Sequence, residues 1–379
     1  MEVAAEFDAD WRRRFRERLR RWHARAGREL PWRNSRDPYR VWISEIMLQQ
    51  TTVAAVVPYF ERFLTRFPDV ATLAAADEQE VLQLWEGLGY YSRARNIHKT
   101  ARTIVAELAG AFPESVRELE KLPGIGRYTA GAIVSFAYDR PAPIVEANTL
   151  RLYSRLLGYT GDPRSSEGQR LLWSFAESIL PRKNSAAFNQ ALMDLGATLC
   201  TPADPGCDRC PVKACCRAFE AGKQSEIPVA QNRPAVTELT EAAVAIEHDG
   251  RYLLCRRPHG ERWAGLWDFP RYATVPYQPQ RNGRNLKNIR IELEHNLAQQ
   301  LGLKAEVGDL LKQLRHSVTR YRIQLLCFES RLAGKKTTPR TEESAWVAPK
   351  QFQDYPLSVT GRKFADLLVN KRDELPFND

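Results

Sequence analysis

Four closely spaced cysteines limit what this chain can fold into more than any other feature of its sequence. Cys200, Cys207, Cys210 and Cys216 follow the pattern C-x6-C-x2-C-x5-C. Four thiolates on a compact loop can hold either a tetrahedral zinc ion or an iron–sulfur cluster. Structural zinc sites usually pair two C-x2-C segments, and this loop contains one. Residues 200–216 are therefore predicted to form a loop around an inorganic centre.

The other three cysteines leave the identity of the fourth ligand open, and the cysteine count indicates the redox state of the compartment. Cys215 lies directly before Cys216, so spacing alone leaves the fourth ligand open by one position. We interpret Cys255 and Cys327 as ordinary buried side chains. The chain has seven cysteines, of which five lie within residues 200–216. An odd count clustered this tightly indicates metal ligation in a reducing compartment, here the cytoplasm.

The charge of the chain points to an anionic partner. The formal net charge is +10, while 43% of the 379 residues are hydrophobic, which is typical of a folded protein with a basic face. Nucleic acid and an anionic membrane surface are the usual partners of such a face, although the charge could also serve solubility alone. No segment approaches the roughly 18 apolar residues of a membrane span, and the N-terminal residues lack the apolar core of a signal peptide.

The first part of the chain, residues 8–221, is predicted to be mostly helical. Phe15 and Leu19 belong to an apolar stripe on a basic helix, which we interpret as core. Asp37 followed by Pro38 favours a helix start. Further helical runs are expected at about 53–67, 77–86, 92–110, 128–138, 148–157, 167–180 and 185–198.

Residues 222–236 are predicted to be a linker, because they are polar, contain two prolines and lack periodicity. From residue 237 to 379 the pattern is that of an α+β domain. His248-Asp249-Gly250 is a strong hairpin signal between two strand-like runs, and Gly302 can end a leucine-rich helix. The expected strands and helix cover residues 240–247, 251–256, 286–301 and 321–329.

A glycine-rich segment, LPGIGR at residues 122–127, joins two predicted helices within about 115–138. Gly124 and Gly126 can bring backbone N–H groups close to a phosphate at a helix N-terminus. On its own this segment is explained equally well as a plain connection between helices. Beside the cysteine loop, it predicts a helix-hairpin-helix that binds DNA.

Glu45 is the candidate general acid. It lies in an otherwise apolar helical run, residues 41–48, just after Asp37 and Pro38. Burial there would raise the pKa of the carboxyl group and keep it protonated near neutral pH, so that it could protonate a purine ring nitrogen. The alternative is a glutamate on the wet face of an amphipathic helix.

Taken together, these segments resemble the adenine DNA glycosylases of the MutY type over about residues 22–216. The resemblance implies a mostly helical helix-hairpin-helix glycosylase region with a [4Fe–4S] loop, followed by an α+β Nudix-like domain. It also implies Cys216 as the fourth cluster ligand. The partner would be duplex DNA in which adenine is mispaired with 8-oxoguanine or guanine. The matching segments are LPWR (30–33), SEIMLQQT (44–51), GLGYYSRARN (87–96), LPGIGRYTAGAI (122–133), FNQALMDLGA (188–197) and the cysteine loop.

The resemblance also assigns roles to single residues. Glu45 would protonate N7 of an adenine that has been flipped out of the duplex. Gln50 and Tyr90, with Gln49 beside them, would wedge into the duplex around the mispair. The residues that would line the adenine pocket are Leu30, Trp32, Arg33 and Gln190. The residues that would bind phosphate at the hairpin are Gly124, Gly126 and Arg127.

Tyr128 decides between two glycosylase classes. Bifunctional relatives carry a Schiff-base lysine at this position, and a tyrosine cannot form an imine. We therefore expect a monofunctional, monomeric glycosylase and place Tyr128 in the catalytic group. An endonuclease III-like glycosylase for oxidised pyrimidines is the second candidate, and both Tyr128 and the appended C-terminal domain disfavour it.

The sequence departs from the family pattern at its second carboxylate. The family has an aspartate in the context V/L-D-G-N-V, whereas this chain has V-E-A-N-T with Glu146 in that place. The longer side chain keeps the charge, but a misplacement of about 1 Å can reduce a rate about 10²-fold. We expect Glu146 to act as the electrostatic partner, with Asn148 orienting it. The alternative is a slow, substrate-shifted or non-catalytic lesion-binding protein.

The C-terminal region departs from the family in a second way. Residues 256–271 resemble the start of a Nudix-like domain, but residues 295–302 carry amides where a Nudix hydrolase binds magnesium with carboxylates. Nucleotide hydrolysis is therefore not expected. The family's lesion-reading Phe-Ser-His is represented by V-T-R, which ends at Arg320. We expect His316, Thr319 and Arg320 to contact the base opposite adenine, with a plain phosphate contact as an equal alternative for Arg320.

Overall fold

The computed structural model describes residues 7–230, 235–258, 260–277, 284–334, 337–341 and 343–373. The chain divides into two compact units. The first, here called the helical unit, comprises Met1–Ala76 and Arg95–Asn232, and the second, here called the C-terminal unit, comprises Asp77–Ala94 and Arg233–Asp379. The sequence predicted two domains that are each continuous, with boundaries at 221 and 237. The compact units are not continuous in sequence, because Asp77–Ala94 groups with the C-terminal residues.

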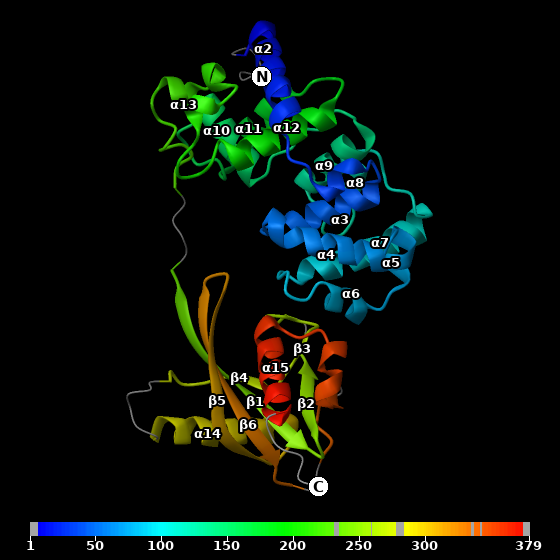
Figure 1. Ribbon diagram of the computed structural model, residues 1–379, viewed down its shortest axis with the longest axis vertical. Helices are drawn as coiled ribbons and strands as arrows, with labels where there is room; N and C mark the ends of the chain where they lie inside the picture. Colours follow the sequence, from blue (N-terminus) through cyan, green and yellow to red (C-terminus); the bar gives the residue numbers. More distant parts are fainter. Residues whose placement is uncertain are drawn as a thin grey trace. The chain divides into compact units, whose positions relative to one another are not determined.

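The described residues of the helical unit form helices joined by short loops (Figure 1). The helical runs predicted within residues 8–221 correspond to helices of this unit, except the run at 77–86, which is α6 (Glu78–Leu84) of the C-terminal unit, and a mostly α fold is confirmed. No described helix is long and apolar enough to cross a membrane. The helices are α2 (Ala9–Ala26), η1 (Pro31–Asn34), α3 (Pro38–Leu48), α4 (Val53–Arg66), α5 (Val70–Ala75), part of α7 (Ser92–Leu108), α8 (Val116–Leu119), α9 (Arg127–Tyr138), α10 (Ala147–Leu157), α11 (Ser166–Ile179), α12 (Ser185–Thr198), η2 (Cys207–Arg209), η3 (Lys213–Cys215) and α13 (Arg217–Glu220).

Side-chain caps fix where the important helices begin. The Asp37 carboxylate accepts a hydrogen bond from the backbone N–H of Tyr39 at 2.9 Å, and Pro38 takes the first helical position of α3. Glu146 caps α10 by accepting from the backbone N–H groups of Asn148 and Thr149. The caps therefore set the starting points of the two helices that carry the predicted carboxylates.

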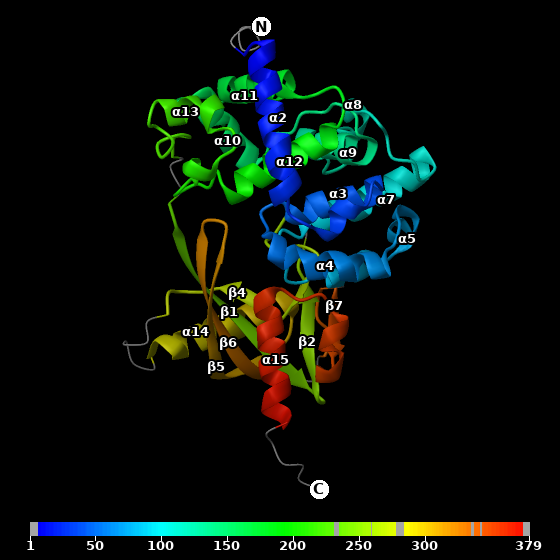
Figure 2. The same ribbon diagram turned by 45° about the horizontal axis from the view of Figure 1, so that its top comes forward.

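The basic helix α2 buries one face, as its apolar stripe predicts. Phe15 and Leu19 are fully buried, and the Phe15 ring lies edge-on to that of Phe188 in α12, with centroids 6.2 Å apart. Figures 1 and 2 both show α2 lying across α12. This packing ties the start of the chain to the helices that precede the cysteine loop.

The C-terminal unit is an α+β fold with a seven-stranded mixed sheet (Figure 1). The strand order is β3-β2-β1-β6-β5, β4 also pairs with β1, and β7 pairs with β2. β1 and β6 run parallel, and the other strand pairs are antiparallel. The elements are α6 (Glu78–Leu84), β1 (Thr237–His248), β2 (Arg251–Arg256), β3 (Trp267–Asp268), β4 (Arg271–Ala273), α14 (Arg284–Asn296), η4 (Leu297–Leu301), β5 (Ala305–Val318), β6 (Tyr321–Leu332), β7 (Ser344–Val347), η5 (Pro349–Asp354) and α15 (Val359–Asp373).

Helices α14 and α15 cover opposite faces of this sheet. Ala242 and Val244 of β1 pack in one core with Ile289 of α14, whereas Ala243 packs in the other core with Phe364 of α15. The alternation follows from the two-residue period of a strand. Both strands of the predicted hairpin and the helix ended by Gly302 are confirmed, and Gly302 has the left-handed backbone of a C-cap.

The segment Asp77–Ala94 is held to the rest of the C-terminal unit by polar contacts. Glu86 receives hydrogen bonds from the Arg362 guanidinium at 2.7 and 2.9 Å and from the backbone N–H of Leu357 at 3.0 Å. The indole N–H of Trp267 donates to Gln79 at 2.9 Å. These contacts fix the short helix α6 and the glycine-rich turn that follows it.

Candidate active site

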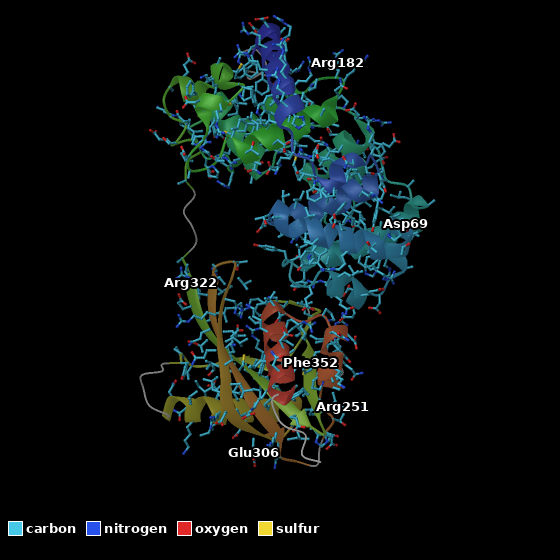
Figure 3. The ribbon with its side chains drawn as sticks, in the orientation of Figure 1. Asp69, Arg182, Arg251, Glu306, Arg322 and Phe352 are labelled. Atoms are coloured by element: carbon cyan, nitrogen blue, oxygen red, sulfur yellow. The ribbon has the colours of Figure 1, made fainter. Side chains whose placement is uncertain are left out.

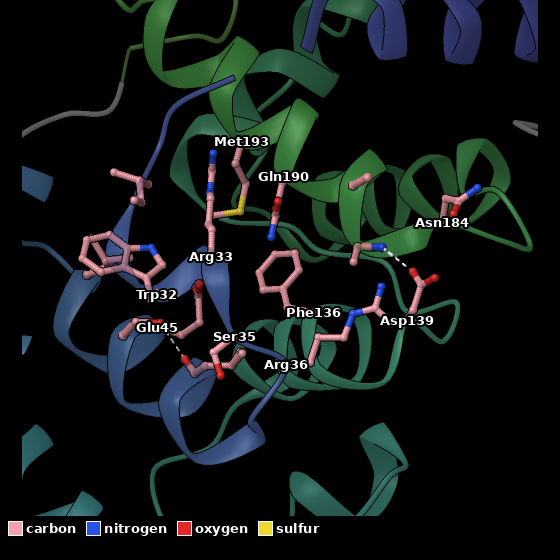
Figure 4. Close-up of a pocket in the computed structure, with 16 residues that line it drawn as sticks. Trp32, Arg33, Ser35, Arg36, Glu45, Phe136, Asp139, Asn184, Gln190 and Met193 are labelled. Atoms are coloured by element: carbon pink, nitrogen blue, oxygen red, sulfur yellow. Dashed lines mark hydrogen bonds between the residues drawn. The ribbon is translucent and has the colours of Figure 1, made fainter. Parts of the chain in front are cut away.

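A cavity of about 220 Å³ lies in the helical unit between α3, α9 and α12 (Figure 4). It is small compared with a typical pocket for a drug-sized ligand. All four residues predicted to line an adenine pocket line this cavity, together with Glu45. The lining residues are Leu30, Trp32, Arg33, Ser35, Arg36, Val41, Ser44, Glu45, Leu48, Phe136, Asp139, Asn184, Ala186, Ala187, Gln190 and Met193.

Glu45 is buried at the edge of this cavity, with 3% of its surface exposed. Burial raises the pKa of its carboxyl group to about 7, and the nearby Glu146 charge raises it further, whereas hydrogen bonding from Tyr128 and the Arg33 charge oppose the shift. The structure thus places Glu45 on the buried face of α3. At neutral pH a substantial fraction of the carboxyl groups carries a proton that a base could accept.

Tyr128 contacts Glu45 directly. Its hydroxyl group donates a hydrogen bond to Oε2 of Glu45 over 2.5 Å, from the first turn of α9 to the middle of α3. Burial and the two neighbouring carboxylates raise the pKa of Tyr128 well above its ordinary value, so the phenol remains protonated and acts as a donor. The Tyr128 phenol therefore fixes the position of one Glu45 carboxylate oxygen.

Glu146 reaches the same region from the start of α10. Its two carboxylate oxygens accept from the backbone N–H groups of Asn148 at 2.8 Å and of Thr149 at 2.9 Å. Burial raises the pKa of Glu146, and these two hydrogen bonds oppose the shift. A Cβ on Gly131 would lie 2.5 Å from the carbonyl oxygen of Pro143, so only glycine at this position of α9 lets the loop before Glu146 approach so closely.

Asn148 contacts Glu146 through its backbone N–H, which donates to Oε2 of Glu146 at 2.8 Å. The side-chain oxygen of Asn148 instead accepts from Arg151 at 2.9 Å. The same guanidinium donates to the carbonyl oxygens of Gly196 and Cys200, each at 2.7 Å. Arg151 therefore links the segment that carries Glu146 to the first residue of the cysteine loop.

Asp194 is a residue of the site that the sequence analysis did not single out. Its fully buried carboxylate accepts from Arg33 at 2.7 and 2.8 Å and from Arg28 at 2.6 Å, and it lies 3.1 Å from the His23 ring. Burial alone would raise its pKa, but the hydrogen bonds from His23 and Arg33 lower it well below its ordinary range. Asp194 thus holds the Arg33 side chain against the cavity. Its only signal in the sequence is its place within FNQALMDLGA.

The two predicted wedge residues share a backbone feature. Gln50 has a φ of 56° and Tyr90 a φ of 49°, in the left-handed region that non-glycine residues seldom adopt. Both side chains are exposed, whereas Gln49 is partly buried near Thr129, with 3.4 Å between its amide nitrogen and the Thr129 hydroxyl. A strained backbone that presents an exposed side chain is typical of a functional contact.

The helix-hairpin-helix is formed as predicted. Gly124 has a φ of 74°, and a Cβ there would lie 2.7 Å from Asn96, so this turn requires glycine. Gly126 is the N-cap of the twelve-residue helix α9 and leaves its first N–H groups available to an anion. Arg127 stacks on Trp173, with its guanidinium carbon 3.9 Å from the ring centroid.

The four predicted cysteine ligands come together. Cys200, Cys207, Cys210 and Cys216 line one small pocket among apolar side chains, whereas Cys215 is not part of its lining. The guanidinium of Arg155 lies 3.3 Å from Sγ of Cys200. Burial raises the pKa of Cys210 to about 12 and that of Cys216 to about 11, so binding here requires a cationic centre that displaces the thiol protons.

The donor set is four thiols that line one pocket. Four cysteine thiolates can bind either a tetrahedral zinc ion or an iron–sulfur cluster. In the described part of the chain, no group of three or more His, Cys, Asp or Glu side chains is already arranged around a metal position.

In the C-terminal unit, the expected reading residues lie at the β5–β6 hairpin. Thr319 and Arg320 form its exposed turn, with Thr319 at a φ of 51°, and His316 precedes them on β5 at intermediate exposure. The helix α14 ends in the π-helical turn Leu297–Leu301, which carries the amides that replace the metal-binding carboxylates.

Comparison with known proteins agrees with this geometry. Residues 43–178 match the family model of the HhH-GPD superfamily of base excision DNA repair proteins, and residues 241–367 match the NUDIX domain. The adenine DNA glycosylase of Mus musculus is 31% identical over 92% of this chain and 76% of its own length. That of Buchnera aphidicola subsp. Baizongia pistaciae is 38% identical over 75% of this chain and 82% of its own length. The chain belongs to the adenine DNA glycosylase family.

The glycosylase also resembles a solved structure in its helical part. A thermostable thymine-DNA glycosylase matches 55% of this chain and 97% of its own, with a TM-score of 0.52 and 28% identity. The helix-hairpin-helix fold is therefore shared with glycosylases that act on a different base. The fold of the helical part therefore does not by itself decide which base is removed.

The buried acid predicts a stability that depends on pH. The pKa of Glu45 is about 7 in the folded protein and 4.5 as a free side chain, so the folded protein binds more protons between these values and loses stability as the pH rises through them. The shift corresponds to about 3 kcal/mol at pH 8. The neutral variant Glu45→Gln should therefore have a higher melting temperature than the parent glycosylase at pH 8, and the difference should shrink at pH 5. Equal differences at both pH values would contradict this prediction.

Proposed function

We propose that this glycosylase excises adenine from duplex DNA in which the adenine is mispaired with 8-oxoguanine or guanine, as a step of base excision repair. The observation that carries the proposal is a buried carboxyl group with a pKa near 7, beside a second carboxylate, on a small cavity. This is the combination that acid-assisted cleavage of a glycosidic bond requires. We also propose that it acts as a monomer. The cysteine loop fits the reducing cytoplasm.

In the proposed reaction Glu45 transfers its proton to N7 of the flipped adenine. The bond between N9 and C1′ then breaks, and its electron pair leaves with the neutral adenine. The deoxyribose carries positive charge in an oxocarbenium-like state, which the Glu146 carboxylate stabilises. Water adds to C1′ and loses a proton, so the product is an abasic site. Tyr128 holds Oε2 of Glu45, which fixes the direction in which the acid presents its proton.

The same residues exclude lyase chemistry through an imine. Tyr128 occupies the position of the lysine nucleophile of bifunctional relatives. Its phenol, with a pKa raised well above the ordinary value, cannot form the imine that an amine would form. We therefore propose a monofunctional enzyme that leaves the DNA strand intact.

The direct test is a single-turnover reaction on a duplex with one 8-oxoguanine:adenine pair. We expect strand breakage at adenine only after alkali, because the enzyme leaves an alkali-labile abasic site. The rate should fall about tenfold per pH unit well above pH 7 as Glu45 loses its proton. The Glu45→Gln variant should show no measurable excision.

Controls separate this function from its alternatives. Breakage without alkali would indicate a lyase, and release of an oxidised pyrimidine in place of adenine would indicate an endonuclease III-like enzyme. Tight binding without any base release would indicate a lesion-binding protein. A Glu45→Gln variant with normal activity would show that another group is the acid.

Glu146 can be tested through its charge. Glu146→Gln has nearly the same shape but no charge, and we expect its excision rate to fall about 10²-fold or more, in line with the loss of a transition-state electrostatic contact. Glu146→Asp keeps the charge and can still cap α10, so it should remain within about tenfold of the parent rate. Rapid excision by Glu146→Gln would rule out electrostatic stabilisation by this residue.

We also propose that Cys200, Cys207, Cys210 and Cys216 hold a [4Fe–4S] cluster. The four sulfurs line one pocket, and Arg155 beside Cys200 offsets negative charge on the thiolates. When bound, the cluster would stabilise the loop and provide no chemistry at the cavity. Arg151 hydrogen-bonds to both Cys200 and Asn148, so an ordered cysteine loop would also support the segment that carries Glu146.

Neighbouring cysteines provide a matched pair for testing this site. Cys216→Ser removes a proposed ligand, whereas Cys215→Ser removes the adjacent thiol, which does not line the pocket. We expect the parent and Cys215→Ser to contain about four iron and four sulfide per chain with visible cluster absorption, and Cys216→Ser to lose most of both. Loss of iron in the Cys215 variant alone would assign the fourth ligand to that residue.

A further inference from the structure

A groove of about 1020 Å³ lies in the helical unit between α2 and the loop that joins α11 to α12. The exposed side chain of Arg182 belongs to this loop (Figure 3). Most of the charged side chains at the groove are cationic, and Glu17 is the one acid among its described lining residues. We call this surface the basic groove. Its arginine and lysine side chains are Arg12, Arg13, Arg16, Arg20, Arg182 and Lys183.

Three of the arginines form a row along one face of α2. Arg12, Arg16 and Arg20 are four residues apart, so consecutive positions lie about 6 Å apart along the helix axis. Burial lowers the pKa of Arg16, and the charge of Arg12 lowers it further, which is the electrostatic cost of this arrangement. The Arg16 guanidinium donates to the carbonyl oxygens of Ile179 and Leu180 at 2.8 and 2.9 Å. The row is therefore fixed to the end of α11, on the other wall of the groove.

Little of this charge is offset within the groove. Arg13 forms an ion pair with Asp10, whereas Glu17 pairs with Arg21, which does not line the groove. The cationic lining residues that have no carboxylate partner in the described part of the chain are Arg12, Arg16, Arg20, Arg182 and Lys183. Guanidinium groups with uncompensated charge are suited to bind carboxylates or phosphates.

The floor of the groove is apolar. Phe188 and Ala191 of α12 are buried and line it, and Leu180 and Pro181 line it beside them. A floor of this kind gives no hydrogen bonds to a ligand, but it can bury apolar side chains. A basic rim above an apolar floor therefore fits a ligand that carries both negative charges and apolar groups.

The phosphate backbone of DNA matches this surface less well than a peptide does. Phosphates would neutralise the arginines, but they would place no apolar group on the floor. None of the described lining residues of the groove belongs to the candidate DNA contacts of the helical unit, which are the hairpin at Gly124 and Gly126 and the exposed side chain of Gln50. The charge and the floor together favour a protein ligand.

We propose that the basic groove binds an acidic, amphipathic segment of a partner protein. Its carboxylates would pair with the arginines of α2 and with Arg182, and its apolar side chains would pack on Leu180 and Phe188. A helix that carries glutamate at every fourth residue would match the row of arginines turn for turn. Asn184 and Ala187 line both the groove and the catalytic cavity, so the partner would lie beside the active site.

The test measures binding of a fluorescein-labelled peptide to the full-length protein by fluorescence anisotropy. The probe repeats Glu-Ala-Leu-Ala over about fifteen residues, which is the length of α2 that lines the groove (residues 9–23). One control peptide has glutamine in place of glutamate, and a second has serine in place of leucine. A labelled oligothymidylate of the same length tests nucleic acid as the ligand.

Two charge reversals test the two walls of the groove. Arg20→Glu changes the wall formed by α2, and Arg182→Glu changes the loop. Arg18→Glu is the matched control, because Arg18 is exposed on the same helix but does not line the groove. All three positions are exposed, so the melting temperatures should stay close to that of the parent protein.

We expect Arg20→Glu and Arg182→Glu each to weaken binding of the probe about tenfold, because each reversal replaces an attraction by a repulsion. Arg18→Glu should change the affinity less than about threefold, since its charge lies outside the contact. Both control peptides should bind to the parent protein more weakly than the probe.

Four outcomes would overturn the proposal. The first is no binding of the probe to the parent protein, and the second is an equal loss in all three variants, which would indicate overall charge alone. The third is equal binding of the probe and the serine peptide, which would show that the floor is not used. The fourth is tighter binding of the oligothymidylate than of the probe, weakened by the same two reversals, which would assign the groove to nucleic acid.

Discussion

The removal of one carboxyl group from water governs the chemistry of the helical unit. Glu45 lies on the buried face of α3, where desolvation is the largest influence on its pKa. A second carboxylate, Glu146, stands near enough to raise the pKa of Glu45 further. Two carboxyl groups that share a poorly solvated space resist simultaneous ionisation, which is the condition under which one can serve as acid and the other as anion. The surrounding helices hold this unfavourable pair together.

Several buried polar networks make that pair tolerable. Tyr128 donates to Glu45, the backbone at the start of α10 donates to Glu146, and Asp194 fixes Arg33 on the cavity. The Tyr128 and Asp194 contacts join segments that are distant in sequence, whereas the Glu146 contacts are local to the start of α10. The absence of a side chain at Gly131 lets α9 pack closely against the loop that leads to Glu146. Any side chain there would collide with the carbonyl oxygen of Pro143 in that loop. The site is thus rigid before any substrate arrives, which is what electrostatic stabilisation requires.

Much of the fold could be predicted from local sequence signals. Helical periodicity and caps located the helices of the helical unit, as Asp37 with Pro38 shows for α3, because such signals act within a few residues. The strand β5 was missed because it is largely polar along its exposed length, with Lys312, Gln313 and Arg315 facing solvent. The assignment of α6 to the C-terminal unit was also missed, since it depends on Glu86 and residues near position 360.

The residues of the candidate site also divide into those that local sequence signals identify and those that only the structure shows. The residues that line the cavity lie within recognisable segments, so Trp32, Glu45 and Gln190 could be named from the sequence. Asp194 could not, because its importance comes from contacts with His23, Arg28 and Arg33, which lie far away in the sequence. The sequence placed Asn148 beside Glu146, but only the structure shows that the contact is made by the backbone N–H of Asn148. Roles that depend on long-range approach are those that a linear pattern does not encode.

The Arg151 guanidinium connects the cysteine loop to the active-site segment, with hydrogen bonds to Cys200, Gly196 and Asn148. Such a connection is thermodynamically reciprocal. If an ordered loop favours the catalytic arrangement of residues 146–148, then whatever occupies the cavity must favour the ordered loop by the same free energy. A glycosylase bound to DNA would then keep the proposed cluster longer than one that has no DNA bound. The protein would therefore be most vulnerable to loss of iron in the intervals between substrates.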